Sequence, residues 1–159
     1  MVPVIAPLAS ADEARDANIQ VTVTPNAQTS NPGESGEYTV RVYNSGSNPV
    51  TVQLSTAEGQ DQDCSAYTST ITQIPGPIDS GSYEEASMNV TLAQNAEGSC
   101  ETTVTATAQD QPEPPEPPGQ PATETATVTT TAGDGSGNAV FGVDLSMVTS
   151  SKTWGGEET

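Results

Sequence analysis

The stretch Tyr38–Gly46, which reads Tyr-Thr-Val-Arg-Val-Tyr-Asn-Ser-Gly, decides the fold of this chain. Apolar side chains at Tyr38, Val40 and Val42 alternate with the polar side chains of Thr and Arg. A period of two places one face of a β-strand in a core and the other in water. The Asn44-Ser45-Gly46 sequence that follows predicts a hairpin turn.

The same alternation recurs along most of the chain, and no helical periodicity interrupts it. Further strands are expected over residues 19–24, 50–54, 69–74, 86–92, 100–108 and 122–132. About seven strands separated by turn signals predict an all-β fold, an immunoglobulin-like antiparallel β-sandwich. The expected core consists of Val21, Tyr38, Val40, Val42, Val52, Leu54, Val90, Leu92, Val104 and Val128.

A sequence segment near the start of the chain is repeated, in similar form, near its end. Residues 143–159 match residues 19–38 when Leu145 is aligned on Val21. We therefore expect an Ig-like sandwich over residues 19–133 and a linker over residues 134–139. Residues 140–159 would then form the first strand of a second Ig-like module or a donor strand.

The first residues resemble the end of a secretory signal. Residues 1–11 are mostly apolar and finish in Ala9-Ser10-Ala11, an A-x-A cleavage pattern. They are too short to span a bilayer. We interpret residues 1–11 as a signal-peptide remnant or leader and residues 12–18 as a linker.

The chain is strongly acidic. Its net charge is −18, with three Lys and Arg residues, and its hydrophobic content is 32%. Nucleic acids and anionic membranes are excluded as partners because both require basic patches. Since salt screens self-repulsion, we expect a melting temperature that rises from low to moderate ionic strength. A flat melting temperature across that range would contradict this prediction.

Cys64 and Cys100 are the only cysteines. A single pair of cysteines in an exported chain predicts a disulfide, with two free thiols as the alternative. Zinc is disfavoured because no His is present to complete a ligand set.

The sequence Asn31-Pro32-Gly33-Glu34, followed by Tyr38–Gly46, resembles the Ig-like modules of archaeal and bacterial cell-surface proteins, the CARDB-type domains and their relatives. Thr103–Ala108 is similar to their penultimate strand. The resemblance covers about residues 19–132. It implies tandem Ig-like modules without catalytic residues, although the cysteine pair and a proline-rich insertion depart from the plainest members.

The sequence disfavours a catalytic site and offers candidate ligands for one kind of metal ion. No His can act as a general base and no Ser or Cys lies in a nucleophile elbow, so no enzymatic activity is expected. Calcium is the only cofactor with candidate ligands, because hard carboxylate oxygens suit it. The candidates are Glu58, Asp61 and Asp63 in one loop and Asp110, Glu113 and Glu116 in another.

Three surface features complete the inventory of candidate sites. Asn89-Val90-Thr91 is an N-glycosylation sequon, and the alternation of its strand predicts that the asparagine faces solvent. The segment Gln109–Pro121 predicts a stiff, acidic, protruding loop, with a docking arm as the alternative. Aromatic residues that could stack on sugar are Tyr43, Tyr67, Tyr83 and Trp154.

The sequence thus predicts a non-enzymatic structural or adhesive module of a secreted or cell-surface protein, acting as a spacer and loop-display scaffold. Its expected partners are other copies or neighbouring modules of the same surface protein, with no membrane insertion by this segment. One alternative is a filament or surface-layer subunit that adds residues 140–148 to the sheet of the next copy. The candidate residues for strand addition are Phe141, Val143, Leu145 and Met147. Another alternative is a carbohydrate-binding module.

Overall fold

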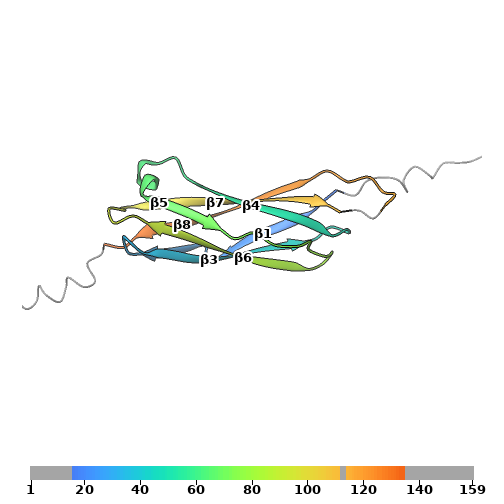
Figure 1. The fold of residues 1–159 in the computed structure, drawn as a ribbon. Helices are drawn as coiled ribbons and strands as arrows, with labels where there is room; N and C mark the ends of the chain where they lie inside the picture. The colour runs from blue at the N-terminus through green and yellow to red at the C-terminus, as the bar shows by residue number, and fades with distance from the viewer. Residues whose placement is uncertain (1–15, 112–113, 135–159) are drawn as a thin grey trace, which may run out of the picture.

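Eight strands and a single 3-10 helix form the described part of the chain, residues 16–111 and 114–134 of the computed structural model (Figure 1). In β3 every second side chain is buried, as the sequence pattern requires. The elements are β1 (Ile19–Thr24), β2 (Ala27–Ser30), β3 (Ser35–Asn44), β4 (Val50–Glu58), η1 (Gln62–Ala66), β5 (Tyr67–Ile71), β6 (Tyr83–Leu92), β7 (Ser99–Asp110) and β8 (Ala122–Ala132).

The strands form two four-stranded sheets that pack face to face (Figure 1). Sheet A has the order β1-β3-β6-β5 and is antiparallel throughout. Sheet B has the order β2-β8-β7-β4, in which only the β2–β8 pair is parallel. This is the constant-type immunoglobulin arrangement, with the first strand divided between the sheets as β1 and β2. The predicted all-β Ig-like sandwich is confirmed.

Two details of the strand prediction were wrong. The expectation of about seven strands omitted β2, a four-residue strand without apolar alternation that follows Pro25. The strand expected over residues 69–74 lies instead at Tyr67–Ile71. The chain leaves the sheet after Ile71, and the buried side chain of Ile74 joins the core from a loop.

The predicted hairpin at Asn44-Ser45-Gly46 is also wrong, because β3 and β4 belong to different sheets. Asn44 is fully buried and organises a bend between the two sheets. Its Nδ2 donates to the carbonyls of Asn48 and Ile78, each at 2.8 Å, and its Oδ1 accepts from the Gly46 N–H at 2.9 Å. The side chain thereby replaces the backbone bonds of a two-residue turn.

The core lies between the sheets and contains nearly every residue predicted for it, although Val21 is only partly buried. It also includes Ile74, Ile78 and Met88, which were not among the residues expected in the core, although Met88 shares the alternation of Val90 and Leu92. Tyr38 joins the two layers, since its ring is buried on β3 and its hydroxyl lies 2.6 Å from Thr130 Oγ1 on β8.

Replacing either of two buried threonines of sheet B by valine should change stability in opposite directions. Thr102 Oγ1 has no hydrogen-bond partner among the described residues, whereas Thr130 Oγ1 is bonded to Tyr38. Thr102→Val should raise the free energy of unfolding by about 1 kcal/mol because it removes an unsatisfied polar group. Thr130→Val should lower it by about 1 kcal/mol because it deprives the Tyr38 hydroxyl of a partner. Urea denaturation measures both, and changes of the same sign would contradict the prediction.

One open side of the sandwich, between β4 and β5, is closed by side chains. The amide of Gln73 bonds to β4 as a strand would: its Oε1 accepts from the Leu54 N–H at 2.9 Å, and its Nε2 donates to the Leu54 carbonyl at 2.8 Å. Ser69 of β5 donates from its backbone N–H to Glu58 of β4 at 3.0 Å. We call the Gln73–Leu54 pair the amide clasp. It occupies backbone groups that an exposed edge strand would offer to another chain.

Gln73→Ala should therefore expose the edge of β4. We expect a loss of stability of about 1 kcal/mol, from two lost hydrogen bonds, together with self-association at high protein concentration. Analytical ultracentrifugation would detect the association. The control is Gln53→Ala, since Gln53 is exposed on β4 and carries no such bonds. A variant at Gln73 that stays as monomeric as the control would contradict the proposed role of the clasp.

The described chain begins and ends at opposite ends of the long axis (Figure 1). At one end, which we call the arm end because the proline-rich loop before β8 lies there, Ala17 N–H bonds to the Gln120 carbonyl at 3.1 Å. At the other end, which we call the disulfide end because Cys64 and Cys100 are bonded there, β8 finishes at Ala132, whose N–H bonds to the Gly98 carbonyl at 2.8 Å. Strand β8 thus runs from one end of the sandwich to the other. No helix in the described residues is long and apolar enough to cross a membrane.

Candidate functional site

The predicted disulfide between Cys64 and Cys100 is present, with an S–S distance of 2.01 Å and a Cα–Cα distance of 4.9 Å. Both residues are buried. Cys64 lies in η1, between β4 and β5, and Cys100 lies at the start of β7. The bond therefore attaches the connection between the two sheets to an inner strand of sheet B, at the end where β8 finishes.

Tyr67 supports the same end of the molecule from β5. Its hydroxyl donates to the Gly98 carbonyl at 2.8 Å. Burial raises the pKa of the Tyr67 hydroxyl above its usual range, and the negative charge of Asp63 acts in the same direction. Tyr67 was a candidate for sugar stacking in the sequence, and that assignment is wrong because only 3% of the residue is exposed.

The acidic candidates for calcium do not form a common ligand group in the described part of the chain. Glu58 is bonded to Ser69, through both the backbone N–H and the hydroxyl. Asp61 and Asp63 lie at the start of η1, outside that contact. In the stretches 16–111 and 114–134, no group of three or more His, Cys, Asp or Glu residues is placed to hold a metal ion. Calcium binding stays a prediction.

The second acidic group is also dispersed. Asp110 is buried at the end of β7, where its carboxylate accepts from Asn48 Nδ2 at 3.2 Å. Glu116 is exposed in the loop before β8, and Glu113 lies outside the described residues.

The proline-rich segment begins later than the sequence indicated. Gln109 and Asp110 still belong to β7, so the loop that we call the proline arm starts at Gln111 and ends at Pro121. Its base is fastened to the sandwich: the Gln111 N–H bonds to the Pro49 carbonyl at 2.9 Å, and Gln109 Nε2 donates to the Gly119 carbonyl at 3.3 Å. The arm connects the antiparallel strands β7 and β8.

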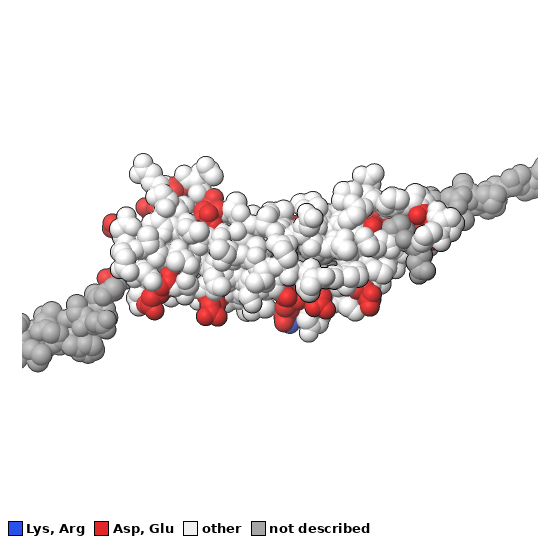
Figure 2. Space-filling view, viewed as in Figure 1, with Lys and Arg blue, Asp and Glu red and all other residues white. Residues whose placement is uncertain are grey.

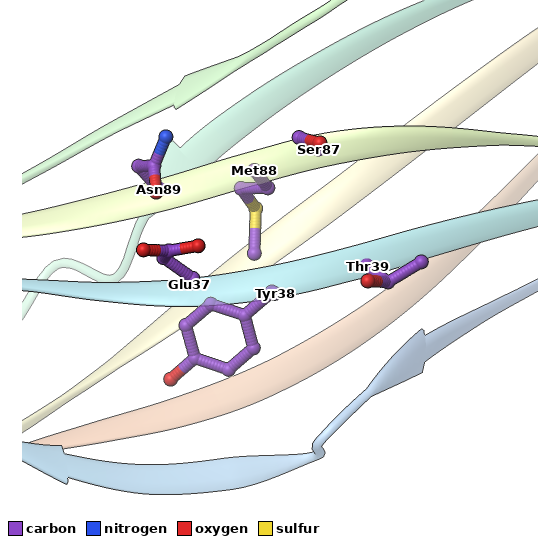
Figure 3. Close-up of a pocket in the computed structure, with 6 residues that line it drawn as sticks. All are labelled: Glu37, Tyr38, Thr39, Ser87, Met88 and Asn89. Carbon is purple, nitrogen blue, oxygen red and sulfur yellow. The ribbon is translucent and has the colours of Figure 1, made fainter.

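Asn89 of the sequon lies on β6, opposite Glu37 of β3, and is partly exposed on the outer face of sheet A. Side chains of both residues border a depression of about 320 Å³ (Figure 3). Modification of Asn89 stays a prediction. The strand-addition candidates Phe141, Val143, Leu145 and Met147 lie outside the described residues, and so does Trp154.

The structure brings together Tyr43 and Tyr83, which are far apart in the sequence. They are directly opposite each other on β3 and β6 and are the exposed large hydrophobic residues of the described chain. Arg41 lies beside them: its guanidinium is 4.1 Å from the centroid of the Tyr83 ring, and its Nη2 is 2.9 Å from Glu85 Oε1. We call Arg41, Tyr43, Tyr83 and Glu85 the tyrosine platform.

Basic charge is far scarcer than acidic charge on the visible surface. In Figure 2 acidic side chains lie along the lower side, where β3 and β6 run, and also near both ends of the upper side, with a single basic group on the lower side. Arg41 is the only Lys or Arg in residues 16–111 and 114–134. The outer face of sheet B pairs threonines across β7 and β8, for example Thr103 with Thr127 and Thr105 with Thr125. The one described cation is therefore part of the platform.

Sequence reasoning missed the tyrosine platform because it depends on pairing between strands. Tyr43 and Tyr83 carry no local motif, and both their pairing and the contact of Tyr83 with Arg41 follow from the register of β3 against β6. The sequence nonetheless contained one indication. Both tyrosines stand at positions where the alternating pattern of their strands places a polar, outward-facing side chain, and a large aromatic ring is unusual there.

Comparisons with known proteins establish no family. No protein-family model matches the chain, and no curated protein matches its sequence. Among solved structures, the chain is similar to the ASH or PapD-like domain of human CEP192 (PapD-like domain 7), with 18% identity and a TM-score of 0.49 over 70% of this chain and 84% of that one. The strand order of the two sheets shows an Ig-like fold, and the resemblance to CARDB-type modules in particular stays a prediction.

Proposed function

We propose that this chain is a non-enzymatic structural module of a secreted or cell-surface protein, which acts as a spacer between its neighbours and displays loops. The observation that carries the proposal is the path of the chain, which enters the sandwich at the arm end and leaves it at the disulfide end. A module of this shape adds its full length to an array.

The length of that contribution follows from β8. Its 11 residues connect the two ends, and at about 3.4 Å per residue they span about 35 Å. A spacer also needs resistance to tension. Pulling on the two ends would draw β1 and β2 toward the arm end and β8 toward the disulfide end. The hydrogen bonds between β2 and β8 lie across that direction, so they would share the force.

The extracellular location rests on separate support. A buried disulfide is typical of oxidising compartments. The high negative charge and the sequon at Asn89 fit the same setting.

Scattering from tandem repeats tests the spacer function. Chains containing two, four and six copies of residues 12–139 should lengthen by about 35–40 Å per copy in small-angle X-ray scattering. The single copy supplies the reference length. Arrays that collapse, with a maximum dimension that does not grow in proportion to the number of copies, would contradict the proposal.

A filament subunit is the second candidate, favoured by the alternating apolar residues of 140–148. An added strand needs a free edge. The amide clasp occupies β4, whereas β1 pairs only with β3 among the described strands. Size-exclusion chromatography separates the two functions: the filament requires oligomers that disappear when residues 140–159 are deleted, and the spacer requires a monomer in both cases.

A further inference from the structure

The tyrosine platform exposes apolar surface at a defined place. Tyr43 is 37% exposed and Tyr83 is 49% exposed. Because they are direct partners in the antiparallel register of β3 and β6, their Cβ atoms are about 5 Å apart. Burying apolar ring surface is favourable, so two adjacent exposed rings on a regular sheet offer binding energy to a flat ligand.

Arg41 holds the Tyr83 ring in place and adds charged hydrogen-bonding groups to the platform. Its Nε and Nη2 both donate to Glu85 Oε1, at 3.1 and 2.9 Å, while its guanidinium lies over the Tyr83 ring. The side chains of Arg41 and Glu85 are 50% and 44% exposed, so they keep donors and acceptors that face water. The ion pair also balances its own charge within an acidic protein.

A polar strip continues from the platform along the outer face of sheet A. Thr22, Thr24 and Thr39, with Arg41 and Glu85, border an open depression of about 360 Å³. Thr39 also borders the depression near Glu37 and Asn89, where Figure 3 shows these two side chains on neighbouring strands. From Tyr43 to Glu37 along β3 the strip measures about 20 Å, enough for several sugar residues.

We propose that the tyrosine platform and this strip bind a neutral glycan. The C–H face of a sugar ring would stack on Tyr43 and on the ring surface of Tyr83 that Arg41 leaves exposed, as amphipathic rings do at wet interfaces. Its hydroxyls would donate to Glu85 and accept from Arg41, and the threonine hydroxyls can do either. This binding function is additional to the proposed spacer function.

Charge and surface character select this ligand. A net charge of −18 repels acidic polysaccharides, and Arg41 is the only basic residue of the described sandwich. A protein partner would bury about 800 Å² on each side around an apolar centre. The strip offers two rings followed by hydroxyl, amide and carboxylate groups, which suits a ligand made of hydroxyl groups.

Nuclear magnetic resonance of the full chain, produced without glycosylation, tests the proposal. Cellohexaose, chitohexaose and mannohexaose serve as neutral probes and an oligogalacturonate as the anionic one. We expect at least one neutral probe to shift amide signals of β1, β3 and β6, with a dissociation constant below about 1 mM. Replacing both tyrosines by alanine should weaken binding at least about tenfold, whereas replacing both by phenylalanine should preserve stacking.

The matched control is the double variant Thr105→Ala and Thr125→Ala on the outer face of sheet B, which should bind as the unchanged chain does. Arg41→Gln keeps both rings and should weaken binding severalfold, so the test survives if the alanine variant does not fold. Absence of binding at 1 mM for every neutral probe would overturn the proposal. So would equal binding by the alanine variant, preference for the oligogalacturonate, or shifts caused by self-association of the chain.

Discussion

Replacing Cys64 and Cys100 together by alanine is expected to lower the free energy of unfolding by about 3–4 kcal/mol. The disulfide closes a loop with a sequence separation of 36, and cross-linking such a loop restricts the unfolded chain by about that amount. Small domains have a total stability of only about 5–15 kcal/mol. The loss of stability should be marked in a sandwich whose buried apolar residues are mostly valine and alanine.

Urea denaturation of the double variant measures this loss. Reduction of the unchanged protein with dithiothreitol under denaturing conditions, followed by refolding with reductant present, should give the same stability as the double variant. Ser99→Ala is the matched control, because Ser99 is the exposed neighbour of Cys100 on β7. A double variant within 1 kcal/mol of that control would show that the bond does not hold this end of the sandwich together.

Tyr38→Ala is expected to cost about 3–5 kcal/mol, the range for removing a buried aromatic ring. The ring is 3% exposed and packs between the sheets, and the substitution also removes the hydroxyl contacts with Thr130 and the Thr129 carbonyl. Tyr38→Phe keeps the ring and should cost about 1–2 kcal/mol, because the Thr130 hydroxyl then loses a partner.

Tyr43→Ala is the matched control for this prediction. Tyr43 lies on the same strand as Tyr38 but faces water, so its loss should change the free energy of unfolding by less than about 1 kcal/mol. Thermal unfolding monitored by circular dichroism compares the three variants. Equal destabilisation by Tyr38→Ala and Tyr43→Ala would mean that the assignment of inner and outer faces on β3 is wrong.

The architecture was predictable because its determinants are local. The alternation around Val40 and Val42 identifies both the strand and its buried face, and the parity of Cys100 places its sulfur inside. Periodicity does not state which sheet a strand joins. Asn44 illustrates this limit: its sequence context is that of a hairpin, yet its side chain bonds to Ile78, which is distant in sequence, and the chain crosses to the other sheet.

The candidate site was less predictable, for the same physical reason. Tyr43 and Tyr83 were each recognised as exposed aromatics, but their pairing depends on the register of two strands that are distant in sequence. Gln73 presents a sharper case, because a glutamine in a loop carries no signal that its amide will bond to β4. Contacts that depend on three-dimensional register lie beyond what spacing along a chain encodes.

The amide clasp also has a consequence for the chemical ageing of this protein. Hydrolysis of the Gln73 amide would produce a carboxylate, which can still accept from the Leu54 N–H but has no hydrogen to donate to the Leu54 carbonyl. Slow deamidation would thus remove half of the clasp and add a negative charge beside β4. An old, deamidated population would differ from a freshly made one in its tendency to aggregate, although the two share every backbone atom.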